Sequence, residues 1–115
     1  MRPPTYIISG TARETFHIVC TDTAQSFSND QLFNLSGHLP ISCLVTVEDN
    51  DIRFAYNATP ISGAEGNVNA LGHSLYQRSS FLISNSRDIQ NFQFINHIAG
   101  NNADIMVTMF YEIGK

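Results

Sequence analysis

Charged residues are scarce in this sequence, and positive charges are the scarcest. Charged side chains make up 14% of the chain, well below the roughly 25% that is typical of soluble domains. Six basic residues, only one of them a lysine, stand against ten acidic ones, for a formal net charge of -4. Nucleic-acid binding requires a basic patch that releases counterions, so we expect neither nucleic acid nor an anionic membrane as a partner. A polar surface of low charge instead suits extensive contact with other proteins.

Long apolar runs are also missing. The first ten residues, MRPPTYIISG, contain no apolar stretch of the kind found in secretory signals, and no window approaches the roughly 18 apolar residues of a membrane-spanning helix. We therefore expect the protein to be made in, and at first to stay in, a cytoplasm. Cys20 and Cys43 lie in strand-like segments without C-x-x-C spacing, which favours two buried free thiols over a disulfide.

Motifs for catalysis and metal binding are absent as well. The chain has no G-x-S-x-G elbow, no P-loop, no G-x-G-x-x-G fingerprint and no H-E-x-x-H helix. Its four histidines show no i,i+2 or i,i+4 spacing to one another or to a cysteine; they are His17, His38, His73 and His97. A metal site would therefore have to be assembled entirely across strands. We expect no catalytic residues, no cofactor and no metal.

The chain is instead rich in short segments of β-branched and aromatic residues with turn residues between them. These segments are Tyr6–Ser9, Thr15–Cys20, Gln31–Leu35, Cys43–Glu48, Ile52–Asn57, His73–Gln77, Ser80–Ser84, Asn91–Ile98 and Asp104–Ile113. Such a rhythm predicts strands. Ser, Asn and Asp in residues 24–35 favour a loop and a short strand there over a helical turn. About eight short strands predict an all-β fold, an antiparallel β-sandwich or jelly roll, with a small barrel as the alternative.

The length of 115 residues fits one domain. We predict an N-terminal arm at residues 1–12, stiffened by Pro3 and Pro4, and a single β-sandwich domain at residues 13–115. No internal repeat or low-complexity segment argues for a second domain.

Two hairpins are predicted from alternating apolar residues on either side of a turn. The first joins residues 43–48 to 52–57 across the acidic turn 49–51. The second joins residues 91–98 to 104–113 across the tip 100–102, where positive φ is inexpensive. Its predicted core residues are Phe92, Phe94, Ile105, Val107 and Met109. Met106 and Phe110 lie on the opposite face of the last strand, and we expect that face to be covered too.

The longest irregular segment is ATPISGAEGNVNALGH, residues 58–73. A loop of this length in a compact domain is usually either functional or mobile, and we expect a contact with a neighbouring subunit. Our candidates for protein-interface residues are Arg2, Pro3, Pro4 and Tyr6 in the arm, and Asn67, Asn69 and Leu71 in the loop.

Four segments carry a resemblance to a known family: IRFAYNATP at 52–60, GHSLY at 72–76, RDIQNFQFINHIAG at 87–100 and ADIMVTMFYE at 103–112. An Ile-Arg-aromatic strand leads to a Thr-Pro turn, and an Asp-Ile pair followed by Phe-x-Phe-Ile leads into the closing strand. In these features the chain resembles small virion structural proteins of tailed bacteriophages, the capsid decoration, cement or accessory proteins. The resemblance covers about half of the chain, and the loop ISGAEGNVNAL at 61–71 is longer than the usual turn of that family.

The resemblance implies a non-enzymatic protein on the capsid surface of a virion. Its partner would be the major capsid protein, and it would sit on the lattice as a homodimer or homotrimer that bridges neighbouring capsomers. Multivalent attachment to a symmetric shell lets individually modest contacts add up. Two other functions stay open: a tail or head-fibre accessory module, and a glycan-binding or small-molecule-binding β-sandwich with the 58–73 loop as the lip of its site.

Overall fold

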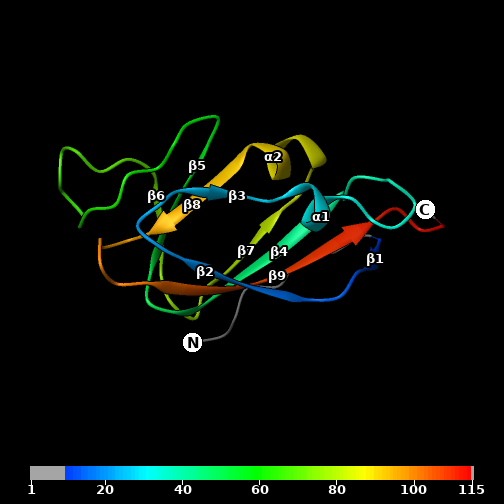
Figure 1. Ribbon diagram of the computed structural model, residues 1–115, viewed down its shortest axis with the longest axis horizontal. Coiled ribbons are helices and arrows are strands. Elements are labelled where there is room, and N and C mark those ends of the chain that lie inside the picture. Colours follow the sequence, from blue (N-terminus) through cyan, green and yellow to red (C-terminus); the bar gives the residue numbers. More distant parts are fainter. Residues whose placement is uncertain (1–9, 115) are drawn as a thin grey trace.

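The structure is a computed structural model that describes residues 10–114. In this range nine strands form two antiparallel sheets, without a closed barrel, and the sheets pack against each other (Figure 1). The prediction of an all-β sandwich is therefore confirmed. The predicted strand Tyr6–Ser9 and the arm candidates Arg2, Pro3, Pro4 and Tyr6 lie outside the described residues.

The larger sheet, sheet A, has β9 and β4 at its centre. It contains β1 (Thr11–Ala12), β2 (Phe16–Cys20), β4 (Ser42–Asp49), β7 (Ser80–Ile83) and β9 (Ala103–Tyr111). Strands β1 and β2 follow each other along the edge of β9 that faces away from β4. The smaller sheet, sheet B, has the order β3-β8-β5-β6 and contains β3 (Gln25–Ser26), β8 (Phe92–Asn96), β5 (Ile52–Tyr56) and β6 (His73–Leu75).

The core lies between the two sheets and follows the period-two alternation of the strands. Along β9 every second side chain is buried, from Ala103 to Tyr111. Sheet B contributes most of the aromatic residues of the core, and Phe92 and Phe94 are fully buried there. The predicted core residues of the closing strand and its predecessor are confirmed: Phe92, Phe94, Ile105, Val107 and Met109.

Both predicted hairpins are wrong. Strand β4 pairs with β7 and β9 in sheet A, whereas β5, which follows it at once, pairs with β6 and β8 in sheet B. Strands β8 and β9 are divided between the sheets in the same way (Figure 1). Each turn is therefore an arch that carries the chain from one sheet to the other. The two arches lie together, because Asn50 Nδ2 donates to the Asn102 carbonyl at 2.8 Å.

Two short helices cap the connections between the sheets. Helix α1 (Asn29–Leu32) begins with a capping box, in which Ser28 and Gln31 exchange side-chain and backbone hydrogen bonds. Helix α2 (Ser86–Asn91) begins at Asn85, whose side chain accepts from the Asp88 N–H at 2.9 Å. The predicted strand Gln31–Leu35 is therefore wrong, because the capping box and the burial of Leu32 favour a helical turn there.

Candidate functional site: the loop between β5 and β6

The β5–β6 loop, residues 57–72, connects two strands that also pair with each other. Among the described residues it is the one connection between consecutive strands of which this is true. It coincides with the irregular segment predicted at 58–73. In Figure 1 this green segment extends beyond the ends of the strands at the left of the molecule. The described part of the chain therefore has its longest connection at one end of the sandwich.

Arg53 fastens the middle and the end of the loop to sheet B. Its side chain points away from the core between neighbouring strands, yet Arg53 is only 7% exposed. Its Nε donates to the Gly63 carbonyl and its Nη1 to the Gly72 carbonyl, both at 2.8 Å. A guanidinium is a rigid fork of donors, so one buried side chain fixes two points of the loop that are nine residues apart in sequence.

Gly72 makes the hydrogen bond between Arg53 and the end of the loop possible. Its φ is +118°, and a Cβ at this position would lie 2.8 Å from the Phe54 carbonyl oxygen. A side chain would therefore collide with the backbone of β5. Only glycine lets the end of the loop approach the sheet closely enough to begin β6.

A polar network holds the first part of the loop against β8. Ser62 Oγ lies 2.6 Å from Asn96 Oδ1 and 2.8 Å from the Asn96 carbonyl. Asn96 is fully buried, and its Nδ2 donates to Asp22 Oδ1 at 2.6 Å. Asp22 Oδ1 also accepts from the Gly100 N–H at 2.7 Å. The hydrogen bond from Gly100 and, to a smaller extent, the one from Asn96 hold the pKa of Asp22 below its usual range.

A second set of polar side chains holds the middle of the loop. His97 Nε2 lies 3.0 Å from Glu65 Oε1, and the Tyr76 hydroxyl donates to the same carboxylate at 3.2 Å. The backbone N–H of Glu65 and the Tyr76 hydroxyl hold the pKa of Glu65 below its usual range. Hydrogen bonding to Glu65 in turn raises the pKa of Tyr76.

Ser74, His97 and Glu65 do not form a nucleophilic triad. Ser74 Oγ lies 3.3 Å from His97 Nε2, the same nitrogen that contacts Glu65. In a triad the nucleophile and the acid contact opposite nitrogens of the imidazole, so that the base is oriented by one and takes a proton from the other. The geometry instead serves to hold the loop.

The structure separates the predicted loop residues into two roles. Asn67 shapes the loop, because its Oδ1 accepts from the Asn69 N–H at 2.9 Å in a local turn. Leu71 forms an isolated antiparallel bridge with Ile61, and the two side chains are 46% and 49% exposed. Val68 at the tip is 95% exposed.

Ile61 and Val68 were missed by reasoning from the sequence. The sequence did contain an indication that they are exposed, because both are branched apolar residues in a segment without the alternation of a strand. We use the name loop ridge for the three exposed apolar residues of this loop, of which Ile61 and Leu71 are paired: Ile61, Val68 and Leu71. The loop thus presents exposed apolar side chains on a segment that is attached to sheet B.

A groove adjoins the loop on the side of β5. It has a volume of about 360 Å³ and is lined by Ala55, Tyr56, Ala58, Leu71, Gly72 and His73. One aromatic ring and one imidazole line its wall beside the exposed Leu71. The lining is mixed polar and apolar, without a group of charges directed at one point.

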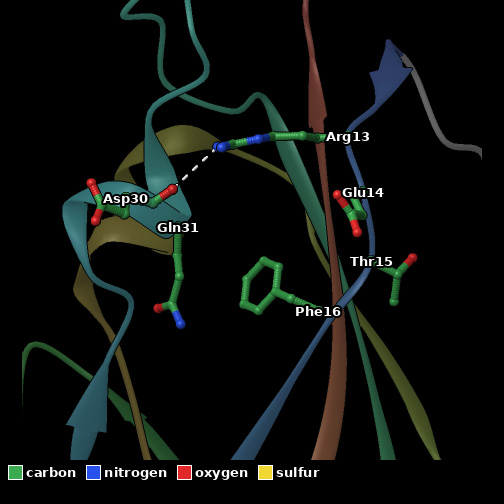
Figure 2. Close-up of a pocket in the computed structure, with 6 residues that line it drawn as sticks. All are labelled: Arg13, Glu14, Thr15, Phe16, Asp30 and Gln31. Atoms are coloured by element: carbon green, nitrogen blue, oxygen red, sulfur yellow. Dashed lines mark hydrogen bonds between the residues drawn. The ribbon is translucent and has the colours of Figure 1, made fainter.

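A second groove lies near α1, at the opposite end from the loop (Figures 1 and 2). It has a volume of about 330 Å³ and is lined by Arg13, Glu14, Thr15, Phe16, Asp30 and Gln31. Arg13 Nη1 crosses it and donates to the carbonyls of Asp30 at 3.2 Å and Phe33 at 2.7 Å. The positive charge of Arg13 is thus used to fasten the end of α1, and the groove has no free cation to attract an anion.

The cysteines are both buried and free, as predicted. Burial raises the pKa of each thiol to about 12, so neither is a reactive thiolate at neutral pH. Within residues 10–114, no group of three or more His, Cys, Asp or Glu side chains could hold a metal ion. In the same range no helix is long and apolar enough to cross a membrane.

Comparison with known proteins does not assign the chain to a family: no family model matches it, and no curated protein matches it. The candidate site therefore has to be interpreted from its own geometry. That geometry is a loop attached to sheet B that exposes the apolar side chains of the loop ridge.

Proposed function

We propose that this protein is a non-enzymatic structural protein of a phage virion, a capsid decoration or cement protein. It would be made in the host cytoplasm and attach to the capsid surface. There it would contact the major capsid protein, act as a homodimer or homotrimer, and stabilise the shell by bridging capsomers. Neither nucleic acid nor a membrane would be its partner.

The observation that carries the proposal is the resemblance of four segments between Ile52 and Glu112 to that family. In the structure these segments form β5, β6, α2, β8 and β9, which together make most of sheet B and the central strand of sheet A. The similar residues are thus the ones that build this fold. The resemblance lies in the framework, and the long β5–β6 loop is the feature that distinguishes this chain.

The geometry of the loop supports attachment to another protein. Protein interfaces combine a desolvated apolar centre with a polar rim, and in the sequence the exposed Val68 lies between the uncharged Asn67 and Asn69. Because Arg53 and Asn96 fasten the loop to sheet B, little conformational entropy is lost when a partner binds. A fastened ridge suits a contact that is repeated over a lattice.

A binding assay tests the proposal directly. Purified protein is mixed with shells of its own phage that lack it, and bound protein is measured by co-sedimentation. We expect wild-type protein to bind and Val68→Asp to bind at least about tenfold more weakly, because burying an unpaired charge at an interface is costly. Leu35→Asp is the matched control, since Leu35 is also fully exposed but lies outside the loop.

The proposal is lost if wild-type protein does not bind such shells and virions without it are equally stable to heat and chelator. Imaging of the particle then separates the capsid function from its alternative in the same virion. Density on the capsid lattice supports a decoration protein, whereas density on a tail or head fibre supports an accessory module.

A second candidate function is glycan binding, and the groove of about 360 Å³ beside the loop favours it. Tyr56 and His73 line this groove, and sugar rings commonly pack on aromatic side chains. Retention on a glycan array that is lost in His73→Ala but kept in Tyr76→Phe would support this function, because Tyr76 is not part of the lining. No retention on any glycan would exclude it.

A further inference from the structure

Sheet B has a vacant strand position beside Tyr56. Strand β6 begins at His73, which lies opposite Phe54. If this pairing continued in the same register, Leu71 would lie opposite Tyr56. Leu71 instead exchanges two backbone hydrogen bonds with Ile61, at 2.9 and 3.1 Å, because the chain turns away from β5 before β6 begins. The end of β5 therefore has a strand neighbour on the β8 side only.

The backbone of Tyr56 is oriented toward this vacant position. In an antiparallel sheet the N–H and C=O groups of successive residues point to opposite neighbours. The Asn57 N–H donates to the Asn91 carbonyl at 3.2 Å, in the same register that pairs Tyr56 with Phe92 of β8. The N–H and C=O of Tyr56 therefore point away from β8, to an edge at which no described strand lies.

The groove of about 360 Å³ beside the loop lies at this edge. The side chain of Tyr56 faces the core, where its ring centroid is 5.8 Å from that of Phe92, and Ala55 faces outward as the next residue of the strand. A groove lined from both faces of one strand runs along the edge of the sheet. We call it the edge groove, lined by Ala55, Tyr56, Ala58, Leu71, Gly72 and His73.

An extended peptide is the occupant that fits the edge groove. Unpaired N–H and C=O groups at the edge of a sheet are complementary to the backbone of a further strand. None of the six lining residues is Asp, Glu, Lys or Arg, which favours an uncharged segment. The sequence contains one at Tyr6–Ser9, outside the described residues, and its Tyr-Ile-Ile-Ser composition predicts a strand.

This segment is too short to enter the groove of its own chain. Gly10 lies at the β1 edge of sheet A, against the Tyr111 carbonyl. The edge groove lies at the opposite side of the sandwich, near β7, because the rings of Phe54 and Phe81 are 4.8 Å apart. Three strand spacings of about 4.8 Å and a sheet separation of about 10 Å place the two about 17 Å apart. The four residues from Gly10 back to Tyr6 span at most about 14 Å.

We propose that the edge groove binds residues 6–9 of a second copy of this chain, which add to β5 as a further strand of sheet B. Each copy has one such segment and one groove, so the exchange closes as a reciprocal dimer or as a ring of three. The inference deepens the homodimer or homotrimer part of the proposed function by naming the segment and the site that join the copies.

The mass of the full chain in solution tests the exchange. At about 100 µM we expect light scattering to give two or three times the chain mass of 12.8 kDa. Ile8→Pro removes a backbone donor of the added strand, and Ala58→Trp fills the groove from a half-exposed position. Both variants should be monomers, and circular dichroism verifies that they are folded.

Ile113→Pro is the matched control. It makes the same replacement at a largely exposed position beyond β9, and it should keep the mass of wild type. The inference is overturned by a wild-type monomer, by an oligomer that persists in both folded variants, or by an oligomer that Ile113→Pro also abolishes.

A disulfide between copies tests the location of the segment. Copies with Ala58→Cys are mixed with copies that carry Ile7→Cys or Ile8→Cys and are oxidised with oxidised glutathione. We expect a covalent product of twice the chain mass from at least one mixture, because neighbouring residues of a strand face opposite sides, and none from Ala58→Cys alone. The native Cys20 and Cys43 are buried. Absence of the product from both mixtures would remove the edge groove as the site.

Other occupants of the edge groove give other results. A wild-type monomer that is retained on a glycan array would assign the groove to the second candidate function and overturn the inference. The test is also separate from the test of capsid binding. An oligomer that does not bind phage shells removes only the proposed function, whereas a monomer that binds shells removes only the inference.

Discussion

Phe92 joins the aromatic residues of both sheets into one cluster. Its ring centroid lies 5.3 Å from that of Phe54 and 5.7 Å from that of Phe94 within sheet B, and 6.4 Å from that of Phe81 on β7 of sheet A. Aromatic pairs at such distances add about 0.5–1.5 kcal/mol to the burial of their area. The aromatic cluster therefore connects the two sheets through the middle of the core.

Replacing Phe94 with alanine tests the importance of this cluster. The ring is fully buried against Phe27 and Phe92, so its loss should lower the free energy of unfolding by about 3–5 kcal/mol. Urea denaturation followed by circular dichroism measures the change. Phe33→Ala is the control, because Phe33 is exposed and should cost little. A near-neutral Phe94→Ala would mean that the assigned face of β8 is wrong.

Asp22 is expected to make stability depend on pH. Hydrogen bonds from Gly100 and Asn96 lower its pKa in the folded state, so the unfolded chain binds more protons near that pKa. The stabilisation is therefore complete above the unfolded pKa of about 3.9 and is lost as the pH falls through the lower folded value.

Asp22→Asn removes this ionisation with little change of shape. We expect the melting temperature of the variant to be below that of wild type at about pH 7, and the difference to shrink at about pH 2.5. Glu48→Gln, at an exposed position on β4, is the control for a general loss of negative charge. An equal difference at both pH values would contradict a role for the Asp22 charge.

Individual strands could be predicted from the sequence, whereas their pairing could not. The segment 104–113 alternates apolar and polar residues, and the structure has β9 at Ala103–Tyr111. Alternation reports which side of a strand faces the core, but the two strands of a hairpin and the two strands of an arch both direct apolar residues inward. The turn at 49–51 therefore looked like a hairpin even though it crosses between sheets.

Helix α1 shows a signal that was available and was not used. Ser28 and Gln31 have the S-x-x-Q spacing of a capping box, although Ser, Asn and Asp around them also suit a loop. Strand β3 has only two residues and no periodicity to detect. Arg53 could not be assigned to the loop from the sequence, because its two acceptors are backbone carbonyls that become neighbours only in the folded chain.

Removing the Arg53 side chain should release the β5–β6 loop while the sheets remain folded. Arg53→Met leaves the Gly63 and Gly72 carbonyls without their donor, and hydrogen bonds to a charged group are worth about 1.5–3 kcal/mol each. Hydrogen exchange measured by mass spectrometry should accelerate in residues 61–72 and stay slow in β9. Arg53→Lys, a single point charge with a different geometry, should give an intermediate result.

Arg78→Met is the matched control for this experiment, because Arg78 is exposed in the turn before β7. Its exchange in residues 61–72 should equal that of wild type. Unchanged exchange in Arg53→Met would show that Asn96 and His97 hold the loop without help from Arg53.

At the scale of the whole molecule, the last strand connects segments from all parts of the chain. Strand β9 pairs with β1, β2 and β4. The hydroxyl of Tyr111 also donates to the Leu32 carbonyl of α1 at 2.5 Å. Such pairing between distant segments cannot form until the closing strand is present, because each contact has to close a long loop of chain.

The segment ADIMVTMFYE, residues 103–112, contains β9. What the sequence could not predict is which strands lie beside β9. Met106 and Phe110 were expected on a covered face, but their neighbours in sheet A were unknown until β2 and β4 were placed, with His17 and Thr46 opposite Met106.

Truncation of the chain tests the role of β9. A chain ending at Asn102 lacks the strand that joins β2 to β4, so the core-facing side chains of both strands lose their neighbours on β9. We expect this chain to show no cooperative thermal unfolding by circular dichroism, since a domain with total stability of about 5–15 kcal/mol cannot lose a central strand. A chain ending at Glu112 is the control, because Ile113 is largely exposed and lies beyond β9. It should unfold cooperatively near the wild-type temperature, and a cooperative transition in the chain ending at Asn102 would mean that sheet B and β4 form a stable unit without β9.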